Sequence, residues 1–244
     1  MKKLFLFAAV MFSSISFSSC SEDDNKENQT SQKLLKQIEE ISADKTIYYD
    51  FSYDDQQRLA KVIVDGDICY SNGDFTYTYT DNSVGVKFNS SCGDEYSYDA
   101  AFALDHNGYV TEFDINGETR WRYEYENGYV SKKQSTSVVS PLFWTYRWEN
   151  GNLMEQRNSY SNSTTYTYTD KPNKLNINLF DAQFGLSNFG IFAYVVFLPT
   201  NFKGSIPSNY PASADNSNIY YEYDDEGYPT QIVGPNANYI LTYY

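Results

Sequence analysis

The chain has 244 residues, 41% of them hydrophobic and 20% charged, a balance that allows a packed core and excludes a wholly disordered chain. Tyr and Phe dominate an aromatic fraction of 18%, and both residue types favour half-buried sheet surfaces. The formal net charge is -14 and Lys and Arg form no cluster, which excludes nucleic acid as a partner.

Residues 1–19 have the features of a secretory signal peptide. Residues 1–3 are a short basic start, and the apolar stretch 4–17 is too short to span a bilayer. Small residues then lead to Cys20. The segment resembles a bacterial lipoprotein signal, which implies that cleavage leaves Cys20 as the lipidated first residue.

Residues 20–33 begin at this cysteine and continue as a polar, aperiodic segment, which predicts a flexible tether. Its residues 21–25, Ser-Glu-Asp-Asp-Asn, resemble the acidic export tag of Bacteroidota lipoproteins that are displayed on the cell surface. The resemblance implies that a lipid anchors the protein in the outer membrane and that the protein is exposed at the cell surface. The membrane is then a partner through that anchor.

Residues 34–44 allow two interpretations. Their apolar residues lie at helical spacing, at Leu34, Leu35, Ile38 and Ile41. The segment is nevertheless followed by a polar turn and by the strand-like run 47–51, which needs a partner strand. We therefore predict a strand, a turn and a second strand.

One short unit then recurs from residue 51 onwards. It reads aromatic, any residue, aromatic, acidic, two or three polar residues with a Gly, and a branched or aromatic residue. Copies begin at Phe51, Phe75, Phe102, Tyr123, Tyr146, Tyr166 and Tyr221. The first six recur about every two dozen residues, the length of one β-hairpin and its connections. Gln57 stands where the unit has Gly, and the second copy is degenerate after its aromatics.

The residues within the unit predict how the hairpins turn and pack. Asn-Gly at residues 107–108, 127–128 and 150–151 supplies the positive φ angles of two-residue hairpin turns. Alternation along each strand gives one aromatic and one polar face. We therefore predict an all-β fold, in which repeated hairpins form an antiparallel meander, either a curled sheet or an open barrel.

The spacing of the units lengthens after the sixth copy, where an insertion lies near residues 180–211. Its run 191–198 is apolar throughout but only eight residues long, which predicts a buried strand or short helix. We expect the insertion to cover the aromatic face of the meander, and residues 239–244 to add a last strand. Residues 34–244 would then be a single repeat-built domain.

Cys69 and Cys92 remain after cleavage, and export places both in an oxidising compartment. Each lies beside turn-forming residues. We predict a disulfide between them; the alternative is two buried free thiols.

The stretch Tyr223-Asp224-Asp225-Glu226-Gly227 resembles the YD repeats of the RHS family. Together with the lipoprotein start and the late insertion, it resembles a group of Bacteroidota lipoproteins that carry an uncharacterised domain of this repeat type. The resemblance covers most of the chain. It implies an all-β lipoprotein and no particular activity.

Candidate catalytic groups are few. Adjacent acids occur at Asp54-Asp55 and within residues 224–226, but neighbouring turn residues point apart and face water. His106 is the single His, so the chain cannot form a zinc site built on several His ligands. Any Ser-His-Asp triad would have to use His106. We expect no catalytic residue, no metal site and no cofactor.

Trp121, Trp144 and Trp148 are the best candidates for stacking on a sugar ring, although an aromatic core is the better explanation for all three. The sequence thus predicts a non-enzymatic surface lipoprotein with a binding or scaffolding role, for a glycan or an envelope protein. The alternatives are a secreted glycan hydrolase and a structural envelope component that binds no ligand.

Overall fold

The computed structural model describes residues 32–66, 72–94, 97–138, 142–175, 177–178, 198–199, 204, 206–215, 217–235 and 237–244. The predicted signal peptide, Cys20, most of the tether, Cys69 and most of the insertion near residues 180–211 lie outside these residues. Among the described residues, no helix has the length and apolar character that crossing a membrane requires.

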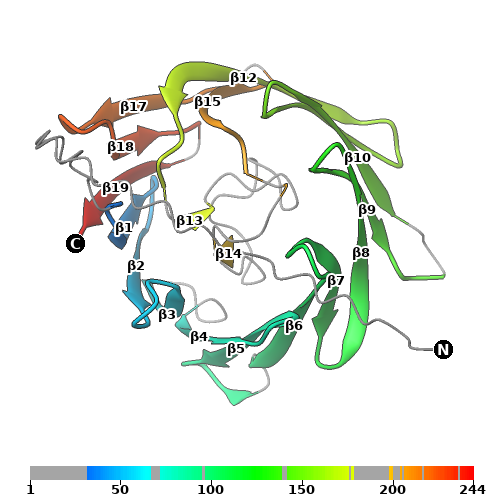
Figure 1. Cartoon of the computed structure of the whole chain (residues 1–244). Helices are drawn as coiled ribbons and strands as arrows, with labels where there is room; N and C mark the ends of the chain where they lie inside the picture. Colours follow the sequence, from blue (N-terminus) through cyan, green and yellow to red (C-terminus); the bar gives the residue numbers. More distant parts are fainter. Residues whose placement is uncertain are drawn as a thin grey trace, which may run out of the picture. The chain divides into compact units, whose positions relative to one another are not determined.

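The described part of the chain is built from β-strands (Figure 1). In chain order they are β1 (Leu35–Ile41), β2 (Thr46–Tyr53), β3 (Leu59–Gly66), β4 (Gly73–Tyr79), β5 (Ser83–Ser90), β6 (Tyr98–Leu104), β7 (Val110–Ile115), β8 (Glu118–Glu126), β9 (Tyr129–Ser135), β10 (Phe143–Glu149), β11 (Asn152–Asn158), β12 (Ser163–Pro172), β13 (Ile177–Asn178), β14 (Leu198–Pro199), β15 (Asn209–Ala214), β16 (Ser217–Asn218), β17 (Tyr220–Tyr223), β18 (Pro229–Val233) and β19 (Asn238–Tyr243).

Seventeen of these strands form one sheet, in which each paired strand is antiparallel to its neighbour. β1 pairs with β2 on one side and with β19 on the other, so the first and last strands lie side by side and the sheet is nearly closed on itself. In Figure 1 the blue β1 therefore lies beside the red β19. The predicted antiparallel meander is confirmed, and it curls into a barrel-like ring. β13 and β14 pair with each other in a separate two-stranded sheet.

β1 shows why residues 34–44 resemble a helix in sequence. A β-bulge between Leu35 and Gln37 adds one residue to the strand. Leu35 and Ile38 are three positions apart, yet both are buried, with 0% and 2% of their surface exposed. The predicted strand is confirmed, and the bulge accounts for the spacing of three residues that resembles a helix.

The two faces of the sheet differ as alternation requires. The buried face carries the first aromatic of each unit, for example Phe51, Phe102 and Tyr166. The opposite face carries ion pairs between neighbouring strands, such as Arg122 with Glu112 at 3.0 Å. This charged face is one that water solvates well.

In four of the seven units the second aromatic has a separate role, which we call the ring–carbonyl bond, and Tyr243 of the last strand makes the same contact. In each case the polar ring atom donates a hydrogen bond to a backbone carbonyl near the start of the preceding strand. Because the two strands are antiparallel, the end of one lies beside the start of the other. The pairs are Tyr53 to Leu35, Tyr79 to Leu59, Tyr168 to Leu153 and Tyr243 to Pro229, all at 2.7 Å, and Trp148 Nε1 to Val130 at 2.8 Å. Each bond ties together the two strand ends that no tight turn joins.

The acidic residue that follows organises the turn to the next strand. Oδ1 of Asp54 accepts the backbone N–H groups of Gln56 and Arg58, both at 2.9 Å. Oδ1 of Asp105 and of Asp224 accepts N–H groups at the same two positions of its own turn. One carboxylate oxygen thus satisfies two backbone donors in three separate hairpins.

The same geometry revises the prediction for the Asn-Gly pairs. Asn127 and Asn150 have positive φ and are followed by positive-φ glycines, so residues 127–128 and 150–151 form the predicted two-residue turns. At residues 107–108 only Gly108 has positive φ, because the turn closes on Asp105 instead. Gln57 occupies the equivalent position with φ of 59°, so this turn keeps the backbone conformation that Gly adopts in the other units.

The N-terminal end of β1 is fixed to the last of these turns. Lys33 Nζ lies 2.8 Å from Asp224 Oδ2 and 2.8 Å from Glu226 Oε1. The two carboxylates raise the pKa of the Lys33 ammonium, so this contact persists throughout the physiological range. The first strand is thereby held at the point where the sheet closes.

The ring–carbonyl bond predicts a defined loss of stability. Burial raises the pKa of the Tyr79 hydroxyl, which therefore stays a donor at neutral pH. Tyr79→Phe leaves the Leu59 carbonyl without this donor and should lower the free energy of unfolding by about 1–3 kcal/mol. The control is Tyr48→Phe, whose hydroxyl donates to Glu39 on the exposed face. Equal urea midpoints for the two variants would contradict the role of the bond.

The turn carboxylates predict a pH dependence. The pKa of Asp105 is lowered by the N–H of Tyr109, against partial burial, and further by the N–H of Asn107. Its contribution is therefore complete above the ordinary Asp pKa of about 3.9 and is lost as the pH falls through the lower folded value. Asp105→Asn keeps an acceptor oxygen but removes the charge. The difference in stability between this variant and the wild type, measured in urea, should shrink between about pH 5 and pH 2; a constant difference would refute the assignment.

Candidate ligand-binding cleft between strands β9 and β10

The seam between β9 and β10 is where the ladder opens. These strands pair only through Lys132 with Thr145, Lys133 with Trp144, and Gln134 with Phe143. Beyond that pairing β9 reaches back to Tyr129 and β10 runs on to Glu149. A cleft of about 320 Å³ lies between the parted ends.

The parted ends are held by the segment that returns from the insertion. The N–H of Val130 donates to Gly204 O at 2.8 Å, and the N–H of Ser208 donates to Gly151 O at 2.9 Å. Gly204 has φ of +78°, and a Cβ there would meet Gly128 O at 2.6 Å. Only glycine allows this close approach. Backbone groups at both edges of the cleft are therefore bonded to residues 204–208.

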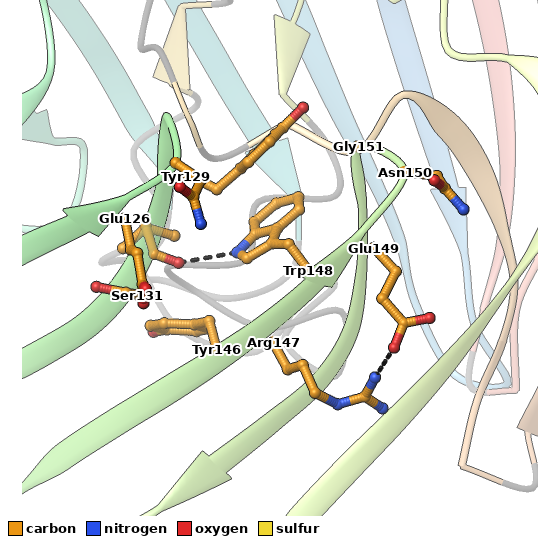
Figure 2. A pocket seen from close by; sticks show the side chains of 11 residues that line it. Glu126, Tyr129, Ser131, Tyr146, Arg147, Trp148, Glu149, Asn150 and Gly151 are labelled. Atoms are coloured by element: carbon orange, nitrogen blue, oxygen red, sulfur yellow. Dashed lines mark hydrogen bonds and ion pairs between the residues drawn. The ribbon is translucent and has the colours of Figure 1, made fainter.

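Aromatic rings form one part of the cleft wall (Figure 2). The rings of Tyr129 and Trp148 are stacked, with centroids 4.8 Å apart and an interplanar angle of 22°. Trp148 Nε1 donates to Val130 O and so bridges β10 to β9 across the open seam. Both rings are only partly buried, which leaves an aromatic surface within reach of a ligand.

Charged side chains form the other part. Glu126, Arg147 and Glu149 line the cleft, and the Arg147 guanidinium is paired with Glu149. Arg147 Nε also lies 3.5 Å from Glu155 Oε2. Hydrogen bonding from Arg157, against partial burial, lowers the pKa of Glu155, and Arg147 adds to this effect. Two carboxylates thus contact the single guanidinium of the cleft wall.

The structure separates the three tryptophan candidates. Trp148 lines the cleft, whereas Trp121 and Trp144 meet edge to face with centroids 5.3 Å apart. Lys133 Nζ lies 4.4 Å from the Trp121 centroid and 5.4 Å from the Trp144 centroid. Lys133 itself is only 8% exposed, so these two rings shield a buried cation. Of the three, Trp148 alone lies at the cleft.

Sequence reasoning missed the partners of Trp148. Tyr129, Val130 and Glu126 belong to the preceding hairpin, and the repeat pattern assigned them to an ordinary turn. One signal was present in the sequence. Trp148 is the unit's second aromatic, where the other ring–carbonyl donors are Tyr.

The residues considered for catalysis lie in turns. His106 is exposed, and Asp54 and Asp224 each accept two backbone N–H groups of their own hairpin. Within the described ranges, no group of three or more His, Cys, Asp or Glu side chains could hold a metal ion.

Cys92 lies just after β5, where its N–H donates to Ser90 Oγ at 3.1 Å. Cys69 lies outside the described residues, so the pairing of the two stays a prediction. Alkylation of the unfolded, unreduced mature protein should modify neither thiol, as mass spectrometry can show. Cys92→Ser should then lower the free energy of unfolding by about 3 kcal/mol. Two alkylated cysteines would contradict the disulfide.

No family model and no curated protein matches the chain. Solved structures do show its fold. A porin-like protein from Bacteroides uniformis aligns with a TM-score of 0.63 at 14% identity, over 86% of this chain and 98% of that one. A porin-like protein from Bacteroides vulgatus aligns with a TM-score of 0.52 at 16% identity, over 87% of this chain and 99% of that one. The chain therefore shares the β architecture of these porin-like proteins.

Proposed function

We propose that this chain is a non-enzymatic, lipid-anchored protein of the outer membrane, displayed at the cell surface, that binds a glycan in the cleft between β9 and β10. The observation that carries the proposal is the cleft itself. It combines a partly exposed Tyr129–Trp148 stack with charged hydrogen-bonding groups at Glu126 and Arg147. An apolar ring face beside polar groups matches the two surfaces of a sugar ring.

The envelope location rests on three supports. Cys20 follows a signal-like segment, and the acidic residues 21–25 come directly after it. The same fold occurs in porin-like proteins of two Bacteroides species. The outer face of the sheet carries ion pairs such as Lys132 with Glu124 at 3.1 Å, which suit contact with water. Attachment through a lipid on Cys20 accommodates all three. Membership of the repeat-built lipoprotein family stays a prediction.

A binding role is favoured over hydrolysis by the state of the acids in the cleft. A glycosidase needs one carboxylic acid that stays protonated near neutral pH, which apolar burial provides. Glu126 and Glu149 are both exposed, and Glu149 is paired with Arg147. These side chains suit hydrogen bonding to hydroxyl groups better than proton donation.

A glycan array probed with the detergent-solubilised mature protein tests the proposal. We expect reproducible binding to one class of glycan. Trp148→Ala should weaken that binding by about tenfold or more, because a central aromatic contact is lost. A blank array would overturn the glycan-binding function and favour a scaffold or structural component of the envelope.

Two variants separate binding from folding. Trp148→Tyr installs the residue found at the equivalent position of other units, so a ring–carbonyl donor to Val130 is kept while the ring surface shrinks. It should fold normally and bind with intermediate affinity. Trp144→Phe changes a ring outside the cleft and should leave binding unchanged. Equal losses in the Trp148→Ala and Trp144→Phe variants would place the binding site elsewhere.

A further inference from the structure

We infer that the cleft between β9 and β10 selects saccharides without acidic groups, with amino-bearing sugars bound best, and rejects glycans that carry carboxylate or sulfate groups. The inference rests on the proposed glycan-binding function and assigns its ligand class. It depends on how the charges of the cleft wall are arranged.

Arg147, the cation of the cleft wall, is already paired with carboxylates of the protein. An incoming anion would seek Arg147, the guanidinium that lines the cleft. Arg147 is paired with Glu149 and also approaches Glu155 at 3.5 Å. An acidic sugar would therefore have to displace a carboxylate that the protein holds in place. Such an exchange replaces one ion pair by another and gains little.

The remaining charge of the wall is negative. Glu126 and Glu149 provide two carboxylates against the single guanidinium of Arg147. The other polar side chains there are uncharged, at Asn127, Ser131 and Asn150. The chain as a whole carries a formal charge of -14, which adds a repulsive background for any polyanion. An acidic sugar is disfavoured both on approach and at the site.

The same groups favour hydroxyl and ammonium donors. A carboxylate accepts a strong, charge-assisted hydrogen bond from a sugar hydroxyl and a stronger one from an ammonium group. Glu126 lies at the end of β8, beside the Tyr129–Trp148 stack, so a ring packed on the aromatics has its edge near this acceptor. A cation near the stack is also attracted by the aromatic faces.

Matched oligosaccharides test the inference. Glucose-, galactose- and mannose-configured oligomers are compared as neutral, amino and uronate forms of equal length, with binding measured by calorimetry on the mature protein. We expect the uronate form to bind about tenfold or more weakly than the neutral form at low salt, and the gap to narrow near 0.15 M because salt screens exposed charges over about 8 Å. A uronate form that binds as well as its neutral counterpart overturns the inference while the glycan-binding function stands. Absence of binding to every oligomer and to the full array overturns the function itself.

A charge-matched pair of variants places the selectivity in the cleft. Glu149→Gln removes the carboxylate paired with Arg147 and should raise the affinity for the uronate form several-fold relative to the neutral one. The control, Glu118→Gln, also removes one negative charge, but outside the cleft. Glu118 begins β8, whereas the cleft residue Glu126 ends it, and Glu118 pairs with Arg120 at 2.7 Å. This control should leave the ratio unchanged. An equal shift in both variants would show that the overall charge sets the preference, and would overturn an assignment to this cleft.

Discussion

The bond between a ring donor and a backbone carbonyl of the preceding strand supports the rest of this structure. A tight turn joins only one end of each hairpin, and the other end would fray without a further contact. Tyr53, Tyr79, Tyr168 and Tyr243 close that end, each with a hydrogen bond of 2.7 Å. After Tyr53, the adjacent Asp54 organises the turn to the next strand. This aromatic–acidic pair thus fixes two junctions within a few residues.

Repetition of this unit also determines how the sheet can end. A meander of hairpins leaves two unpaired edges, which are open to aggregation. Here β1 pairs with both β2 and β19, so neither the first nor the last strand is an edge. Lys33 and the turn at Asp224 hold β1 at this junction. The nearly closed sheet therefore depends on contacts between the two ends of the domain.

The candidate cleft lies between the fourth and fifth copies of the repeat. Trp148 takes the place of Tyr, and residues 204–208 bond to the backbone between β9 and β11. The ladder between β9 and β10 has three pairs, and aromatic and charged side chains of two hairpins line the cleft beyond them. The larger Trp ring both bridges the opening and supplies part of its wall. The same side chain thus ties two strands together and lines the proposed binding cleft.

The sequence by itself determined the strands, the turns and the antiparallel meander, because alternation, aromatic pairs and turn residues act over a few positions. It also singled out Trp148, though not above Trp121 or Trp144. Only the tertiary structure decided that β1 meets β19 and that the seam opens at Val130. These outcomes depend on contacts between residues far apart in the chain, such as Lys33 with Asp224 and Val130 with Gly204. A local pattern carries no information about which distant partner a backbone group will find.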